Sequence, residues 1–368
     1  MSYDLSFWFQ LIITYYHFFM NLKINRYNLT LVFASICLFA FSQAGTGVYQ
    51  FLDLPISSRL AALGGTNVSL RDNDINFAFQ NPALLTDETH NMIGLNMANY
   101  LADIKFGSAV YGRTFGCDNH FAIGIQYVDY GTFRGYTEFK DSTGNFTAKD
   151  YAISLIYSRP ITDKFSVGAT LKPVYSVMER YTSYGLAMDA GVNFIDTANL
   201  FSAGLVCRNI GSQIKGYYSD EDGQHLEPLP FNIQLGLTKK FLHAPLRFSL
   251  TLHNLQQWDL SYNSTNQPSE ALSTTTSSNK ISKIDMAFRH TIVAMEFVPS
   301  KRLYLTVAYN HRRQQEMSMP GFKSSAGFSF GGGIKISKFQ VGFGMTQFQV
   351  GNYAYQFSIS TLLNEFRL

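Results

Sequence analysis

Few residues of this chain combine the types and the spacing that catalysis requires. The segment Ser277–Lys280 has the S-x-x-K spacing of penicillin-binding enzymes, in which the serine lies on a helix and partner motifs such as K-T-G complete the site. Here the segment lies in a low-complexity polar stretch, "STTTSSNK", and the sequence contains no K-T-G. A chance match is therefore favoured over a serine nucleophile.

Three further patterns are also incomplete as chemical sites. The stretch around Gly331–Gly333, "FGGGIK", lacks the lysine and the serine or threonine that a phosphate-binding loop needs in register. Glycine in a barrel strand more often marks a bend or close packing of a plug. The eight histidines show no H-E-x-x-H or paired spacing, which argues against a metal site. Asp220–Asp222 could bind a divalent cation, but a solvated acidic loop is favoured. We therefore predict that the protein is not an enzyme and that it has no cofactor and no metal.

The composition excludes other classes of function. Hydrophobic residues make up 46% of the 368 residues and aromatic residues 15%, whereas charged residues make up only 15%. The net charge is +3 and the basic residues are scattered, so nothing indicates binding to nucleic acid. Downstream of the N-terminus there is no run of 18 apolar residues, which excludes transmembrane helices there. The apolar residues are instead dispersed at every second position, as in a membrane barrel.

The N-terminal residues read as a processing signal. From Met20, two basic residues precede an apolar core over 29–41, which ends in a small-x-small cleavage site, "AFS". That order is typical of a secretory signal peptide. We predict a signal peptide over 20–43 and interpret 1–19 as an extension from a mis-assigned start codon. The alternative for 1–19 is an amphipathic or membrane-anchoring helix.

From His90 onward the chain divides into segments of period two. In "FNIQLGLTKKF", for example, Leu235 and its apolar neighbours alternate with Gln234 and its polar neighbours. Fourteen such segments are present, an even number, as expected for a bacterial outer-membrane barrel. The predicted strands are 90–100, 105–115, 119–131, 148–160, 164–177, 183–196, 201–212, 229–241, 245–262, 281–298, 302–312, 326–337, 339–349 and 353–363.

A soluble β-sandwich also has strands of alternating apolar and polar residues. The lengths of the connections distinguish a membrane barrel from such a sandwich. Six connections are tight turns such as "GCDN" and "LHAP", and the intervening ones include long polar loops such as "GSQIKGYYSDEDGQHLEPLP". Short turns at one end and long loops at the other match the periplasmic and extracellular ends of a barrel. We therefore predict an all-β fold, a 14-stranded antiparallel transmembrane outer-membrane β-barrel over 90–368, with a periplasmic N-terminus and long extracellular loops.

A barrel of this size encloses space that needs filling, because eight strands are enough to enclose an interior that side chains can fill. The segment 44–89, between the predicted signal and the first strand, has about the right length for a plug. Proline cannot donate to a strand ladder, so we expect Asn81-Pro82 to turn the chain toward the wall. The predicted plug residues, whose charged members are expected to contact the polar lumen lining, are Arg59, Gly64, Gly65, Arg71, Asp72, Asp74, Asn81, Pro82 and Ala83.

The same region resembles the N-terminal region of the PorQ family, in the stretch "FLDLPISSRLAALGGTNVSLRDNDINFAFQNPALL". The shared hallmarks are a small-residue helix running into glycines, an acidic connection and an Asn-Pro-Ala turn before the first strand. Downstream stretches such as "LKPVYSVMERYTSYG" and "FSAGLVCRNIGSQIKGYY" are also similar, so the resemblance covers essentially the whole mature chain. PorQ proteins belong to the fourteen-stranded barrels typified by FadL long-chain fatty-acid transporters.

The resemblance implies an outer-membrane component of the type IX secretion system that anchors the cell-surface attachment complex. The partners it implies are a PorZ-like surface protein, a sortase-like protease and a related shuttle barrel, in addition to the outer-membrane bilayer. FadL-like relatives imply the alternative, a channel for hydrophobic small molecules in which the plug gates a path and the glycine-rich strands form a wall opening. The fold alone does not decide between these roles.

Aromatic residues of the long loops are candidates for a docking surface, because Tyr, Phe and Arg are favoured in interface cores. The candidates are Phe133, Arg134, Tyr136, Tyr217 and Tyr218. An interfacial aromatic girdle with strand extensions above the membrane is the alternative.

The alternation also predicts which face each strand residue occupies. Leu235 should face lipid, so that Leu235→Arg costs about 2–4 kcal/mol of stability. Gln234 should face the lumen, and Gln234→Arg is expected to be tolerated.

Overall fold

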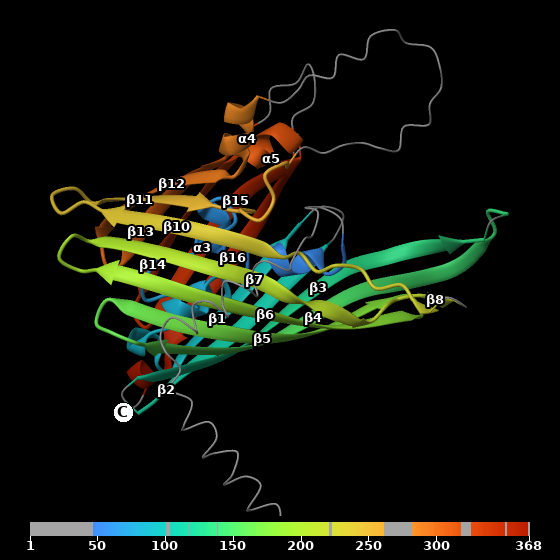
Figure 1. Cartoon of the computed structure of the whole chain (residues 1–368), viewed down its shortest axis with the longest axis horizontal. Helices are drawn as coiled ribbons and strands as arrows, with labels where there is room; N and C mark the ends of the chain where they lie inside the picture. Colours follow the sequence, from blue (N-terminus) through green and yellow to red (C-terminus); the bar gives the residue numbers. More distant parts are fainter. Residues whose placement is uncertain are drawn as a thin grey trace, which may run out of the picture. The chain divides into compact units, whose positions relative to one another are not determined.

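The structure is a computed structural model that describes residues 47–366 except 101–103, 117, 138, 221–222, 261–281, 318–324 and 350–351. Fourteen of its strands form a closed antiparallel barrel, in which neighbours pair in chain order and β1 pairs with β16 (Figure 1). The predicted fourteen-stranded barrel is confirmed. The barrel strands are β1 (Met92–Asn99), β2 (Lys105–Phe115), β3 (Asn119–Tyr136), β4 (Ser142–Pro160), β5 (Phe165–Met178), β6 (Tyr181–Asp196), β7 (Phe201–Lys215), β10 (Asn232–Lys240), β11 (Leu246–Leu252), β12 (Thr291–Ser300), β13 (Leu303–Asn310), β14 (Phe328–Ile336), β15 (Phe339–Gln349) and β16 (Asn352–Leu362).

The remaining elements are short. β8 (Ser219–Asp220) and β9 (Gly223–Gln224) form a small separate hairpin after β7. No helix among the described residues has the length and apolar character needed to cross a membrane. The helices are η1 (Gln50–Asp53), α3 (Ser58–Ala62), η2 (Ile75–Phe79), η3 (Pro82–Leu84), η4 (Asp87–Thr89), α4 (Lys283–Arg289), α5 (His311–Glu316) and η5 (Leu363–Phe366).

The two faces of the barrel wall follow the alternation of the sequence. Apolar side chains point outward, as shown by Leu95, Ile123 and Phe357, which are 50%, 53% and 53% exposed. Polar side chains point into the lumen, where Gln234 and Gln356 are 1% and 2% exposed. An apolar outer belt around a polar lining is the arrangement of outer-membrane barrels.

Several predicted strands differ from the structure near the loops. The strands predicted over 119–131 and 148–160 extend to Tyr136 and back to Ser142, so most of the long loop predicted between them is strand. The predicted strand 245–262 ends at Leu252, and the predicted strand 281–298 begins only at Thr291, because α4 occupies residues 283–289. The predicted strand 302–312 ends at Asn310, whose side chain caps the N-terminus of α5 by accepting a hydrogen bond from the Arg313 amide. At the loop end of each predicted strand, the period-two pattern covers too few residues to distinguish a strand from a short helix.

Two ends of the barrel are distinguished by their connections. We call the end with the turns after β2, β4, β6, β10, β12 and β14 the short-turn end, and the opposite end the long-loop end. At the long-loop end the wall is uneven, because β3 and β4 have 18 and 19 residues whereas β11 and β13 have 7 and 8. The long pair, which we call the β3–β4 ribbon, projects beyond the neighbouring strands (Figure 1).

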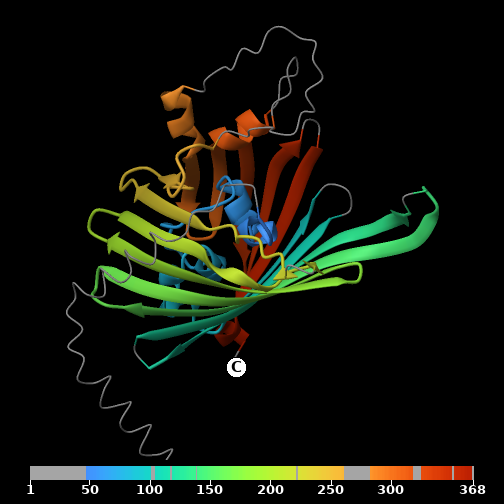
Figure 2. The same ribbon diagram turned by 45° about the vertical axis from the view of Figure 1, so that its right-hand side comes forward.

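Residues 47–91, which we call the plug, lie inside the barrel. Figure 2 shows this segment, in blue, between the strands drawn in green and those drawn in orange and red. Helix α3 packs against β14, β15 and β16, and η3 packs against β4, β5 and β6. Leu60, Phe77 and Phe79 are at most 1% exposed and belong to one apolar cluster with wall residues such as Val110.

The plug runs through the lumen from one end to the other. At its start, the Val48 amide donates to the Pro228 carbonyl at the long-loop end, with an N–O distance of 3.1 Å. At its end it leads into Met92, the first residue of β1, at the short-turn end. The predicted signal peptide and the predicted periplasmic N-terminus stay predictions, because residues 1–46 lie outside the described residues.

Candidate functional site

The plug is fastened to the wall near the short-turn end by a buried network of four charged side chains. The Arg59 guanidinium donates to Glu296 Oε1 at 3.1 Å and to Asp72 Oδ2 at 2.7 Å. Arg247, from β11, donates to Glu296 Oε2 at 2.7 Å and to Asp72 Oδ2 at 3.1 Å. We call Arg59, Asp72, Arg247 and Glu296 the clamp, because two of them belong to the plug and two to the wall.

Three of the four clamp side chains are shielded from water, whereas Asp72 is 34% exposed. Arg59 is 3% exposed, Glu296 1% and Arg247 9%, measured on the side chains. The Arg59 guanidinium also lies over the Tyr304 ring, 4.3 Å from its centre. Burial alone would raise the pKa of Asp72, but the two arginines together lower it below its ordinary value. Removing one member of such a buried pair leaves an uncompensated charge, which costs about 3–5 kcal/mol.

A second charged cluster joins the start of the plug to β5, β6 and β7. Arg208 donates to the Leu52 carbonyl at 3.0 Å and to Gln80 Oε1 at 3.1 Å, so it holds two separate parts of the plug. Beside it, Lys172 Nζ lies 2.5 Å from Asp189 Oδ2, and both side chains are at most 2% exposed. The plug is therefore fixed to both halves of the wall.

Glycines in the wall provide the space into which the plug fits. A Cβ atom added at Gly204 would lie 2.0 Å from the Val68 carbonyl oxygen, and one at Gly344 would lie 2.3 Å from the Ser58 carbonyl oxygen. One at Gly168 would lie 2.6 Å from the Pro82 carbonyl carbon. These contacts are with plug backbone, which cannot turn away as a side chain can. The glycine-rich strands β14 and β15 thus form the seat of α3, not a phosphate loop.

Helix α3 shows how the local sequence orients the plug. The Ser57 side chain caps its N-terminus by accepting from the Leu60 amide. Gly64 and Gly65 end it with φ of 92° and 113°, a region that glycine adopts freely. A Cβ atom at Gly64 would also lie 2.5 Å from Ile292 Cγ2, so this glycine is required both by its backbone and by the wall.

The other predicted plug residues have different partners. The Asp74 side chain caps η2 by accepting a hydrogen bond from the Asn76 amide, which belongs to the plug as well. Its Oδ2 lies 4.0 Å from Arg59 Nη1. Arg71 is exposed and forms no ion pair with a described residue, and its predicted contact with the lumen lining stays a prediction. Asn81 caps η3 and donates to the Val68 carbonyl at 2.8 Å, while Pro82 and Ala83 turn against Gly168 as expected for a turn toward the wall.

The lumen-facing side chain of Gln234 has less free space around it than the sequence analysis assumed. The Thr66 hydroxyl donates to Gln234 Oε1 at 2.8 Å, so the plug contacts this side chain directly. An arginine has no room there. Contrary to the expectation from the alternation, we therefore expect Gln234→Arg to be destabilising.

At the long-loop end the plug is covered by apolar and aromatic side chains. Tyr100, Tyr130 and Tyr217 pack with Leu54 and Ile104 against the apolar cluster of the plug, and we call these five residues the tyrosine floor. Each tyrosine hydroxyl forms a hydrogen bond with a strand residue. The Tyr100 hydroxyl accepts from Gln356 Nε2 at 2.9 Å, the Tyr130 hydroxyl donates to Asp150 Oδ2 at 2.6 Å, and the Tyr217 hydroxyl donates to Ser176 Oγ at 2.5 Å. The floor thus has an apolar body with few polar groups.

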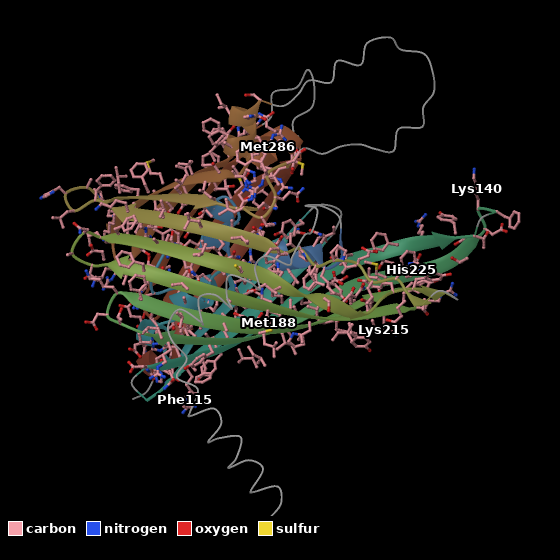
Figure 3. All side chains as sticks on the ribbon, viewed as in Figure 1. Phe115, Lys140, Met188, Lys215, His225 and Met286 are labelled. Atoms are coloured by element: carbon pink, nitrogen blue, oxygen red, sulfur yellow. The ribbon has the colours of Figure 1, made fainter. Side chains whose placement is uncertain are left out.

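The predicted docking residues fall into two groups. Phe133, Arg134 and Tyr136 lie on the β3–β4 ribbon, where the Phe133 ring stacks on Phe146 with 5.3 Å between ring centres. Figure 3 shows the tip of this ribbon, at Lys140, far from the barrel body. Tyr218 is 58% exposed and stacks on His225, whereas Tyr217 belongs to the tyrosine floor.

The residues tested as chemical motifs do not assemble a reactive site in the part of the chain that is described. The S-x-x-K segment and two of the three acidic residues of 220–222 lie outside the described residues. Within them, no group of three His, Cys, Asp or Glu side chains is placed to hold a metal ion. Sequence analysis did not identify Glu296 and Lys172 as site residues. The signal that could have found them is a charged residue at an inward position of an otherwise apolar strand.

Comparison with known proteins shows the fold. No protein-family model and no curated protein matches the sequence. Among solved structures, the Pseudomonas putida toluene transporter TodX matches with a TM-score of 0.51 and 13% identity over 85% of this chain and 98% of that chain.

Two related structures match over similar lengths. A TodX deltaS2S3 mutant, described as a monoaromatic hydrocarbon channel, matches with a TM-score of 0.50 and 12% identity over 83% of this chain and 96% of that chain. A Pseudomonas aeruginosa FadL homologue has a TM-score of 0.47 and 12% identity over 87% and 100% of the two chains. At these identities the likeness shows a shared fold, that of outer-membrane barrels. The resemblance to PorQ proteins stays a prediction.

Proposed function

We propose that the protein binds hydrophobic small molecules at its long-loop end and passes them across the outer membrane, with the short-turn end facing the periplasm. The observation that carries this proposal is the tyrosine floor. Small-molecule sites are lined mostly by apolar and aromatic side chains with a few placed polar groups, and the tyrosine floor has this composition. The proposal agrees with the alternative function expected from the sequence, and the structural neighbours named as a toluene transporter and a hydrocarbon channel support it.

We place the route past the plug away from the glycine-rich strands, where the sequence analysis predicted a wall opening. β14 and β15 pair without interruption from Ser329–Thr346 to Ile336–Phe339, and α3 covers their inner face. The ladder between β4 and β5 instead has a gap of two pairs, between Ala152–Val174 and Leu155–Leu171, and keeps the same register on both sides. Pro173 lies in this gap, faces outward and has no N–H to donate. We place the lateral route at this gap.

Binding is tested with the purified full chain in detergent, titrated with toluene and, separately, with palmitate. Leu54→Asp puts a charge into the tyrosine floor and should weaken saturable binding by roughly tenfold or more. The matched control is Leu226→Asp, an exposed leucine of a loop at the same end, which should leave binding unchanged. Absence of saturable binding, or equal loss in both variants, would contradict the site.

Passage is tested separately, with the same probes in proteoliposomes. Pro173→Val restores an N–H to the gap between β4 and β5, so it should slow uptake while leaving the affinity for the probe unchanged. Unchanged uptake would remove the gap from the account but leave the binding site in place.

A second function has one observation in its favour, the β3–β4 ribbon. Phe133, Tyr136 and Phe139 are 42%, 59% and 86% exposed on it. Exposed aromatic side chains on a projecting pair of strands suit a protein partner, as in the scaffold role in type IX secretion that the PorQ resemblance implies. Under this function, Phe133→Ser with Tyr136→Ser should abolish co-purification of a PorZ-like surface protein and impair cargo attachment. Normal attachment in the double variant would exclude the ribbon as the docking surface.

A further inference from the structure

The short-turn end of the lumen contains a cavity that the proposed functions do not use. It has a volume of about 760 Å³ and lies between the underside of the plug, the turns after β12 and β14, and the end of β16. Arg59 and Asp72 of the clamp form part of its lining. Its volume is in the range of about 300–1,000 Å³ that small-molecule sites occupy.

The lining of this cavity is strongly cationic. Seven lysine and arginine side chains face three carboxylates, those of Asp72, Glu88 and Glu365. Besides Arg59, the cationic lining residues are Lys240, Arg247, Lys301, Arg302, Lys335 and Lys338. A concave surface with one sign of charge and low-dielectric walls concentrates ions of the opposite sign.

Several of these cations have no carboxylate partner among the described residues. Arg59 and Arg247 are paired in the clamp, and Lys335 Nζ lies 2.9 Å from Glu365 Oε1. Lys240, Lys301 and Arg302 have no described carboxylate oxygen within 4.0 Å, and Lys338 lies over the Phe366 ring at 4.7 Å. The cavity therefore holds positive charge that the protein itself does not neutralise.

Two of these cations, Lys240 and Lys335, occupy strand positions that face the lumen instead of the lipid. Lys240 continues the inward series of Gln234 and Thr238 in β10, whereas Arg302 lies in the turn between β12 and β13 and lines the cavity from there. Lys335 belongs to the inward series of β14 that includes Ser329. A lipid headgroup outside the wall would not meet this surface, whereas a soluble anion that enters the lumen would.

We infer that the short-turn end binds a soluble oxyanion with two or more negative charges, carried by phosphate or carboxylate groups. Arginine and lysine side chains recognise both groups through charge-assisted hydrogen bonds. The bound anion shares Arg247 with Asp72, whose side chain is 34% exposed at the cavity. Anion and Asp72 therefore compete for the same guanidinium, and occupancy of the cavity weakens the hold of the clamp on the plug.

The test is calorimetric titration of the full chain in detergent with sodium tripolyphosphate at low ionic strength. We expect one saturable site, with an affinity that added salt weakens. Lys240→Gln combined with Arg302→Gln should weaken binding by roughly tenfold or more, because each removes an unpaired cation. The matched control is Lys164→Gln, an exposed lysine of the same end after β4, which should leave the affinity unchanged. Equal loss in both variants, or no saturable binding, overturns the inference.

Asp72→Asn provides a second test, in which the affinity for tripolyphosphate should rise instead of fall. Removing the competing carboxylate should tighten tripolyphosphate binding, whereas a merely folded surface with scattered lysines would show no change. Unchanged or weaker binding in a variant that keeps its folded barrel, as judged by heat-dependent gel mobility, contradicts the competition.

Two further probes distinguish the sources of the anion. A hexaglutamate peptide that binds in place of tripolyphosphate indicates carboxylates, and failure to compete indicates phosphate. Phosphatidylglycerol vesicles should not compete with either probe, because the lining faces the lumen; competition by vesicles would overturn the assignment to a soluble ligand.

Discussion

The two ends of the lumen hold the same plug by different chemistry. At the short-turn end, Arg59 and Glu296 belong to a buried network in which every charge is paired with another. At the long-loop end, Tyr130 and its neighbours cover the plug with apolar surface and a few hydrogen bonds. A buried ionic network tolerates little displacement of its members, whereas apolar contacts are not directional. The plug is therefore fixed by the clamp at the short-turn end and by Arg208, which holds Leu52 and Gln80, whereas its apolar cover at the long-loop end is adaptable.

The largest expected effect comes from breaking the clamp. Glu296→Ala leaves Arg59 and Arg247 buried with only Asp72 between them, and should cost about 3–5 kcal/mol in the free energy of unfolding. Urea unfolding in detergent micelles measures it. The control is Glu316→Ala, which removes a half-buried i,i+4 pair with Arg312 and should cost less than about 1 kcal/mol. Similar costs for the two variants would remove the clamp as the main fastening.

The next effect tests the fit of plug and wall. Gly204→Ala places a Cβ atom 2.0 Å from the Val68 carbonyl oxygen, and overpacking of this kind costs about 1–3 kcal/mol. Gly107→Ala is the matched control, because its Cβ would lie 3.8 Å from the nearest atom, the Asn96 carbonyl oxygen. If thermal unfolding shifts equally for both, the plug is not seated on the wall glycines.

A smaller effect is expected at the tyrosine floor. Tyr130→Phe removes the hydrogen bond to Asp150 but keeps the ring, and Asp150 retains its hydrogen bond with Ser176. The expected cost is about 1 kcal/mol, measured by the same urea unfolding. A cost as large as that of Glu296→Ala would mean that both ends fix the plug equally.

The smallest effect on stability is expected on the β3–β4 ribbon. Tyr136 is 59% exposed, so Tyr136→Ser should change the free energy of unfolding by no more than about 0.5 kcal/mol. Its thermal unfolding should therefore match that of the unsubstituted chain. A clear loss of stability would show that the ribbon supports the barrel.

The alternation of apolar and polar residues was sufficient to predict the wall. Leu235 and Gln234 face outward and inward as expected, because a strand with period two admits only one assignment of its faces to lipid and lumen. The number of strands followed from the same pattern. The helices α4 and α5 could not be predicted, since each is too short to show a helical period.

The candidate site was only partly accessible to sequence analysis. Arg59 and Asp72 were predicted to contact the lumen lining, and they do, but their wall partner Glu296 lies 237 residues from Arg59 in the chain. The charge of Glu296 within "TIVAMEFVPS" marks it as an inward residue, yet nothing in one sequence says which plug residue it meets. Arg71 has the same residue type as Arg59 but lies in an exposed position.

Hydrogen exchange of the plug measures the central claim most directly. In the full chain in detergent micelles, we expect the backbone amides of α3, η2 and η3 to exchange as slowly as those of β14 and β15. In Glu296→Ala, exchange in α3 should accelerate while β14 and β15 stay protected. Rapid exchange of α3, η2 and η3 in the unsubstituted chain would contradict a plug that is clamped inside the barrel.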